Sequence, residues 1–116
     1  MEVKFIKKGS TLIIKLSGEL DHHYSEYARD KMDGEILKST TRNVILDFSE
    51  LTFMDSSGIG VVAGRYKNIS RLNGKMLIVC DNNQVIRILE MSGIFKIVPL
   101  FSNLDEAIDE LQVYNL

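Results

Sequence analysis

Two adjacent hydroxyls, those of Ser56 and Ser57, are the side chains of this sequence best placed to do chemistry. They directly follow Asp55, after a short apolar run and at the point where a helical pattern begins. The first backbone N–H groups of a helix lack partners within it, and the helix dipole also favours an anion there. The segment therefore suits a phosphoserine, which carries about −1.5 to −2 charges near neutral pH. Judged by residue type alone, helix capping by either serine is the commoner role.

Two glycines, Gly58 and Gly60, follow the serines closely. A glycine inside a helix costs up to about 1 kcal/mol of helix propensity. We expect both glycines to leave the surface beside the hydroxyls open to a partner.

A hydrolase would combine Ser56 and Asp55 with His22 or His23, the only histidines of the chain. The serine does not lie in a Gly-x-Ser-x-Gly turn, and only ordinary helix amides are available to stabilise an oxyanion. We therefore predict that the protein is not an enzyme and has no catalytic residue. Adjacent histidines on a helix point in different directions, and no cysteine or acidic group is spaced to join them, so we expect neither a metal site nor a cofactor.

Nucleotide binding is the alternative function. The pattern Gly58-x-Gly60-x-x-x-Gly64 follows a strand, and Asp81 ends the next strand about 20 residues further on, as in a dinucleotide fingerprint. The loop before Gly58 is long for that fingerprint, and the Gly-Lys-Ser/Thr of a P-loop is absent. A small nucleotide-binding regulatory domain is therefore the second interpretation.

The composition is that of one globular domain, which we expect to span residues 1–116. Apolar residues make up 45% of the chain and charged residues 26%, a balance typical of proteins that bury a core. The 14 basic and 16 acidic residues give a net charge of −2 without a run of one sign. This pattern disfavours direct nucleic-acid binding.

Cellular location is indicated by the N-terminus and by cysteine usage. The first residues lack the apolar stretch of a signal peptide, and no apolar run approaches the roughly 18 residues that span a bilayer. The single cysteine, Cys80, cannot form an internal disulfide, and it ends an apolar run, so we expect a buried thiol. These features predict a cytoplasmic protein without membrane insertion.

Hydrophobic periodicity predicts an α/β sandwich with a mixed sheet, in which an N-terminal hairpin leads into parallel strands and about four helices cover the sheet. The expected order is ββαβαβαβα. In the first helix we expect Asp21 at the N-cap and Leu37 on the buried stripe, and in the second we expect Arg65 on the polar face. The strands are expected at 3–7, 11–17, 43–48, 75–80 and 94–98, the helices at 24–37, 57–72, 85–92 and 104–111, and a loop at 49–55.

Right-handed crossovers place the carboxyl ends of parallel strands on one edge of the sheet. A partner that buried Ser56 at that edge after phosphorylation would have to desolvate a dianion, which is costly. The residues expected at the edge are 18–21, 50–58 and 81–82. Four acidic side chains are expected there around the hydroxyl: Glu19, Asp21, Glu50 and Asp55.

Segments along nearly the whole chain resemble the STAS domain family, and within it the anti-sigma factor antagonists of spore-forming bacilli. The segments are residues 16–23, 53–60, 64–67 and 91–97. The resemblance implies that the unphosphorylated protein binds an anti-sigma factor that is also a serine kinase, which frees the sporulation sigma factor. It further implies that this kinase phosphorylates the serine directly after the aspartate, here Ser56, which abolishes binding, and that a membrane-associated protein serine phosphatase restores it.

By the same resemblance, Ser57 is the neighbour of the acceptor and not the acceptor itself. Glu19 and Asp21 match acidic positions that contact a basic patch of the kinase. The partner-binding set implied in this way is Glu19, Asp21, Asp55, Ser56, Ser57, Gly58 and Gly60.

Overall fold

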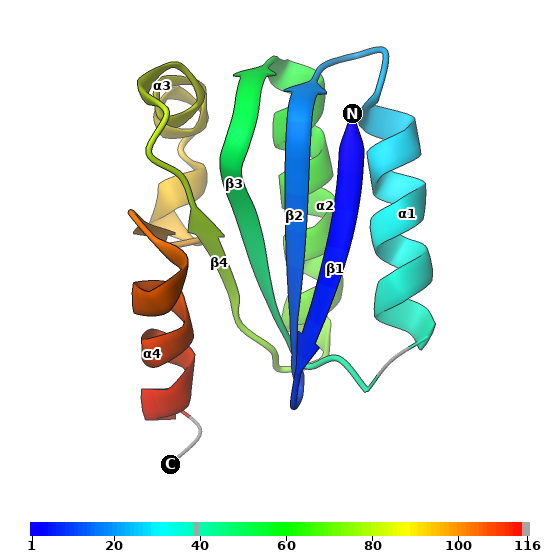
Figure 1. Cartoon of the computed structure of the whole chain (residues 1–116), viewed down its shortest axis with the longest axis vertical. Coiled ribbons are helices and arrows are strands. Elements are labelled where there is room, and N and C mark those ends of the chain that lie inside the picture. Colours follow the sequence, from blue (N-terminus) through cyan, green and yellow to red (C-terminus); the bar gives the residue numbers. More distant parts are fainter. Residues whose placement is uncertain (39, 115–116) are drawn as a thin grey trace.

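A five-stranded sheet with the strand order β1-β2-β3-β4-β5 lies at the centre of the computed structural model, which describes residues 1–38 and 40–114 (Figure 1). The first two strands are antiparallel, and each later strand pairs in parallel with the one before it. The strands are β1 (Glu2–Lys8), β2 (Thr11–Leu20), β3 (Asn43–Met54), β4 (Met76–Val79) and β5 (Leu100–Phe101).

Helices cover both faces of the sheet. Within the described ranges they are α1 (Ser25–Lys38), α2 (Ser56–Arg71), α3 (Asn83–Ser92), the short 3₁₀ helix η1 (Ile94–Lys96) and α4 (Leu104–Tyr114). Figure 1 shows α1 and α2 on the face of the sheet opposite to α4. The predicted fold class, the mixed sheet and the order ββαβαβαβα are confirmed.

Two apolar cores result from the alternation of side chains along the strands. Leu12, Ile14 and Leu16 of β2 belong to the larger core, together with buried residues of α1, α2 and α3. Ile13 belongs to the smaller core, under α4. Since β3 contributes to both cores, residues 43–48 are buried without interruption, as expected of a strand covered on two sides.

The expectation for Cys80 is confirmed, because the side chain is buried and burial raises the pKa of its thiol. Across residues 1–38 and 40–114, none of the helices combines the length and the apolar character needed to cross a membrane.

The predicted loop at 49–55 is wrong, because β3 continues to Met54. Polar residues in this half of the strand suggested a loop, but they pair with the second half of β2 through two register shifts. Thr52 Oγ1 also donates a hydrogen bond of 3.1 Å to the carbonyl of Gly18. Both strands therefore deliver their carboxyl ends to the same edge, where Leu20 lies opposite Met54.

The predicted strand at 94–98 is also wrong. Gly93 ends α3 in the left-handed region with φ 81°, and the Ser92 hydroxyl accepts a hydrogen bond from Ile94 N, so the chain turns into η1. The last strand is the two-residue β5, which follows Pro99. Leu37, expected on the buried stripe of α1, is 84% exposed because it lies beside that stripe at the end of the helix.

Arg65, expected on the polar face of α2, is only 6% exposed. Its Nε lies 2.9 Å from Asp33 Oδ1 of α1, and this ion pair links the two helices. Neither Nε nor Nη1 has a well-aligned hydrogen bond to any described residue. Burial lowers the pKa of Arg65, and the neighbouring carboxylate of Asp33 opposes that effect. A helical periodicity cannot reveal such a residue, since a cation is buried only where another element supplies its partner.

We predict that Asp33→Asn lowers the free energy of unfolding by about 1–3 kcal/mol, because the buried guanidinium loses its charged partner. Urea denaturation at neutral pH measures the change. Glu26→Gln, which alters an exposed carboxylate of the same helix, should stay within about 0.5 kcal/mol of wild type. Equal losses in the two variants would contradict a specific role for the Asp33–Arg65 pair.

Candidate functional site

Ser56 is the first residue of α2, at the edge of the sheet where β2 and β3 end (Figure 1). Its side chain is exposed, as the sequence predicts. The hydroxyl has no hydrogen bond to any residue within 1–38 and 40–114. An enzyme that modifies a serine can therefore reach this oxygen without local unfolding.

Asp55 is the N-cap of α2, so neither Ser56 nor Ser57 caps this helix. Its Oδ1 accepts a hydrogen bond of 2.9 Å from Ser57 N, and its Oδ2 accepts one of 3.0 Å from His22 N, in the turn between β2 and α1. The carbonyl of Asp55 also accepts from Gly58 N at 3.0 Å. One carboxylate thus joins the start of α2 to a segment 33 positions earlier in the chain.

These bonds occupy amides that the sequence suggested were free to hold a phosphate. The amides of Ser57 and Gly58 already donate to Asp55, so they are not free to hold a phosphate. Gly58, Gly60 and Gly64 all lie inside α2, and no glycine-rich loop surrounds a phosphate-sized space before the helix. The local geometry therefore gives no support to nucleotide binding at this segment.

The catalytic and metal interpretations find no geometric support in the described ranges. Both oxygens of Asp55 are engaged with backbone amides, so this carboxylate does not orient an imidazole toward Ser56. The ring of His23 packs edge-on against Tyr24, with ring centroids 4.6 Å apart. Within the same ranges, no group of three or more His, Cys, Asp or Glu side chains could hold a metal ion.

Two of the expected acidic side chains lie at the edge beside the start of α2. Glu19, paired with Phe53 in the sheet, is exposed and has no ion pair with any other described residue. Asp21 Oδ1 accepts from Tyr24 N at 3.0 Å, in the turn that leads into α1. The helix begins only at Ser25, so Asp21 stabilises the turn before α1 and, contrary to the sequence prediction, is not the N-cap of the helix itself.

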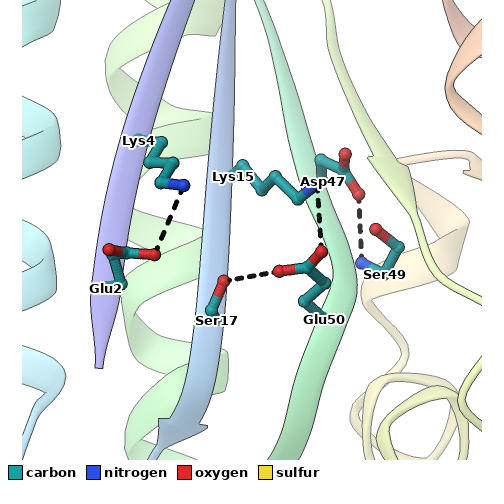
Figure 2. Close-up of polar contacts among 7 residues, drawn as sticks. All are labelled: Glu2, Lys4, Lys15, Ser17, Asp47, Ser49 and Glu50. Atoms are coloured by element: carbon teal, nitrogen blue, oxygen red, sulfur yellow. Dashed lines mark hydrogen bonds and ion pairs between the residues drawn. The ribbon is translucent and has the colours of Figure 1, made fainter.

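Glu50 does not belong to this acidic edge, contrary to the sequence prediction. Because β3 is longer than expected, Glu50 lies on the face of the sheet, where it pairs with β2 (Figure 2). Ser17 Oγ donates to Glu50 Oε2 at 3.0 Å, and Lys15 Nζ lies 3.2 Å from Oε1. The hydrogen bond from Ser17, followed by the contact with Lys15, lowers the pKa of this carboxyl. Its charge is balanced locally.

The two glycines have different environments. A Cβ on Gly58 would lie 2.7 Å from Met54 Cγ and 2.9 Å from the carbonyl oxygen of Leu20, whereas a Cβ on Gly60 would meet nothing within 4 Å. Gly60 leaves the surface open, as expected. The same expectation for Gly58 is wrong, because this residue is buried and provides space for α2 to approach the ends of β2 and β3.

Sequence reasoning missed the role of Asn82, which anchors α3 to the same edge. Its Oδ1 accepts from Gln84 N and Val85 N, capping the helix. Its Nδ2 donates to the carbonyl of Leu51 in β3 at 3.2 Å. An asparagine before a helical pattern is a recognisable capping signal, but the bond to β3 depends on the extension of that strand.

Comparisons with known proteins identify relatives over almost the whole chain. A family model described as STAS domain matches residues 2–107. An anti-sigma F factor antagonist of Paenibacillus polymyxa is 45% identical over 114 residues, which is 97% of each chain. The solved structure of the anti-sigma factor antagonist SpoIIAA in its unphosphorylated form has a TM-score of 0.82, with 30% identity and 96% of each chain covered. SpoIIAA of Bacillus in its phosphorylated form has a TM-score of 0.73, with 30% identity over 95% of this chain and 99% of that one.

We predict that Gly58→Ala lowers the free energy of unfolding by about 1–3 kcal/mol, because the new methyl group overlaps Met54 and Leu20. Gly60→Ala is the matched control, since its methyl group enters open space within the same helix. That control should stabilise the protein by up to about 1 kcal/mol through helix propensity. Thermal and urea unfolding of both variants measure the difference, and equal stabilities would refute the packing role of Gly58.

Proposed function

The chain belongs to the STAS domain family, and we propose that it is an anti-sigma factor antagonist controlled by phosphorylation of Ser56. Support for the first part comes from relatives named as anti-sigma F factor antagonists, which are regulatory binding proteins and not enzymes. Support for the second comes mainly from one observation, the exposed and unbonded hydroxyl of Ser56 at the start of α2.

The proposed switch acts on the docking surface and leaves the fold intact. A phosphate on Ser56 would add about −1.5 to −2 charges to an edge that already carries Glu19, Asp21 and Asp55. The amide of Ser57 already donates to the carboxylate of Asp55 and that of Gly58 to its carbonyl, so these two amides would not compensate the new charge. A partner that packs over the hydroxyl would then bury an unpaired dianion, whose desolvation is costly. Because the side chain is exposed in the free protein, no core contact is lost.

The proposed partners follow from this function. One is an anti-sigma factor with serine kinase activity, which binds the unphosphorylated edge, and the other is a protein serine phosphatase, which removes the phosphate. Gly58 contributes from behind the surface, by allowing α2 to sit close to Leu20. The residues proposed to meet the anti-sigma factor directly are Glu19, Asp21, Asp55, Ser56, Ser57 and Gly60.

We predict that incubation with the kinase and ATP places one phosphate on Ser56, which peptide mass spectrometry locates. Ser56→Ala should abolish incorporation and keep binding to the kinase, whereas Ser56→Asp should weaken binding at least about tenfold, equal to 1.4 kcal/mol. Titration calorimetry measures both affinities. Ser57→Ala is the matched control and should still be phosphorylated. Phosphate found on Ser57, or wild-type affinity in Ser56→Asp, would refute the switch.

We also predict that the acidic edge accelerates association with the anti-sigma factor. Glu19→Gln should slow the association rate severalfold at low salt, because an unpaired surface charge steers encounter. Glu50→Gln is the matched control, since Lys15 and Ser17 already engage that carboxylate on the sheet face. Stopped-flow mixing over a range of salt concentrations measures the rates. Equal slowing by the two substitutions would rule out a specific role for the edge.

A further inference from the structure

A groove with a volume of about 390 Å³ lies between the end of β3 and the side of α3. In Figure 1, α3 lies beside the end of β3, at the edge of the sheet where α2 begins. The groove has a mostly apolar lining. It is lined by Phe53, Met54, Gln84, Arg87 and Ile88.

Two large apolar side chains, one lining this groove and one beside it, are exposed. Phe53 is 46% exposed, and Met91, one turn beyond Ile88 on α3, is 78% exposed. Single exposed apolar residues are common on protein surfaces, and Leu37 and Leu72 are examples elsewhere in this chain. An exposed phenylalanine that lines a depression, with an exposed methionine one turn further along the adjoining helix, indicates a binding surface. Phenylalanine, methionine and arginine are enriched at the centres of protein interfaces.

The two elements that form the groove, β3 and α3, are held together by the hydrogen bonds of Asn82. Asn82 caps α3 and donates a hydrogen bond to Leu51 of β3, so the start of the helix is tied to the strand. At the other end of α3, Gly93 in the left-handed region closes the helix. A preformed groove loses little conformational entropy when a partner binds, which favours affinity.

The groove is continuous with the proposed docking edge. Phe53 and Met54 are the last residues before Asp55 and Ser56 in the chain, and Met54 also packs under Gly58. A surface that covers the hydroxyl therefore reaches the groove without crossing another element. The charge differs on the two sides, because Glu19 and Asp21 lie on the β2 side, whereas the groove carries the guanidinium of Arg87.

We infer that this groove receives an apolar side chain of the anti-sigma factor, next to a carboxylate of that partner which pairs with Arg87. The inference rests on the proposed function, and it adds the chemistry of a second contact. Arg87 is exposed and has no ion pair with any other residue within the described ranges, so its guanidinium is available for a bidentate pair with a carboxylate. The partner surface is then basic where it faces Glu19 and Asp21 and acidic where it faces Arg87. This difference in charge fixes the orientation of the partner over Ser56.

The test uses the anti-sigma factor that phosphorylates Ser56 and compares exposed positions at the two ends of the molecule. Phe53→Ser, Met91→Ser and Arg87→Glu should each weaken binding by about tenfold or more, as expected for central interface residues. Leu72→Ser and Arg71→Glu are the matched controls, because they change the same kinds of exposed side chain at the far end of α2, about 24 Å from its start. The controls should bind like wild type.

The outcomes separate this inference from the proposed function. If Phe53→Ser, Met91→Ser and Arg87→Glu all bind like wild type while Ser56→Asp binds weakly, the groove has no role and the switch stands. If wild-type protein does not bind the anti-sigma factor, the proposed function itself fails.

Stability is controlled in two ways. Thermal unfolding of every variant accompanies the titrations, and Arg87→Lys tests the charge contact without depending on a stability difference. This variant keeps the charge but cannot form the bidentate pair, so it should recover part of the affinity lost in Arg87→Glu. Equal loss in both variants would overturn the predicted carboxylate contact.

Discussion

The close approach of α2 to the ends of β2 and β3 is the constraint on which the rest of the site depends. Gly58 permits it, because any side chain there would overlap Met54 and the carbonyl of Leu20. At this distance the carboxylate of Asp55 bonds both to the helix start and to His22 in the preceding connection. Two segments far apart in sequence thus become one rigid edge. Ser56 lies within it, exposed to solvent and held in place by its neighbours.

This arrangement explains how a small modification can control binding without disturbing the fold. The amides of Ser57 and Gly58 are bonded to Asp55, so an anion on the hydroxyl gains less from the helix start than free amides would give. The charge of Glu50 is balanced by Lys15 on the sheet face, whereas Glu19 at the edge is unpaired within the described ranges. Added negative charge therefore acts on whatever approaches the edge.

Polar contacts between the other elements fix the positions of the residues around the Ser56 hydroxyl. The buried pair of Arg65 and Asp33 links α2 to α1, and Asn82 links α3 to β3. Each is a polar contact between elements that also share the larger apolar core. The acidic side chains and the groove beside α3 consequently keep a constant relation to Ser56, as a specific protein interface requires.

Local patterns in the sequence determined the order of elements, the mixed sheet and the position of Ser56 at a helix start, because periodicity and strand-to-helix transitions depend on neighbouring residues. Other features required the tertiary structure. The polar residues after Phe48 are strand only because β2 offers them partners. Arg65 is buried only because Asp33 of another helix faces it, and Gly58 supports packing only because Leu20 lies against it. Such contacts join residues more than 30 positions apart, and no local pattern specifies them.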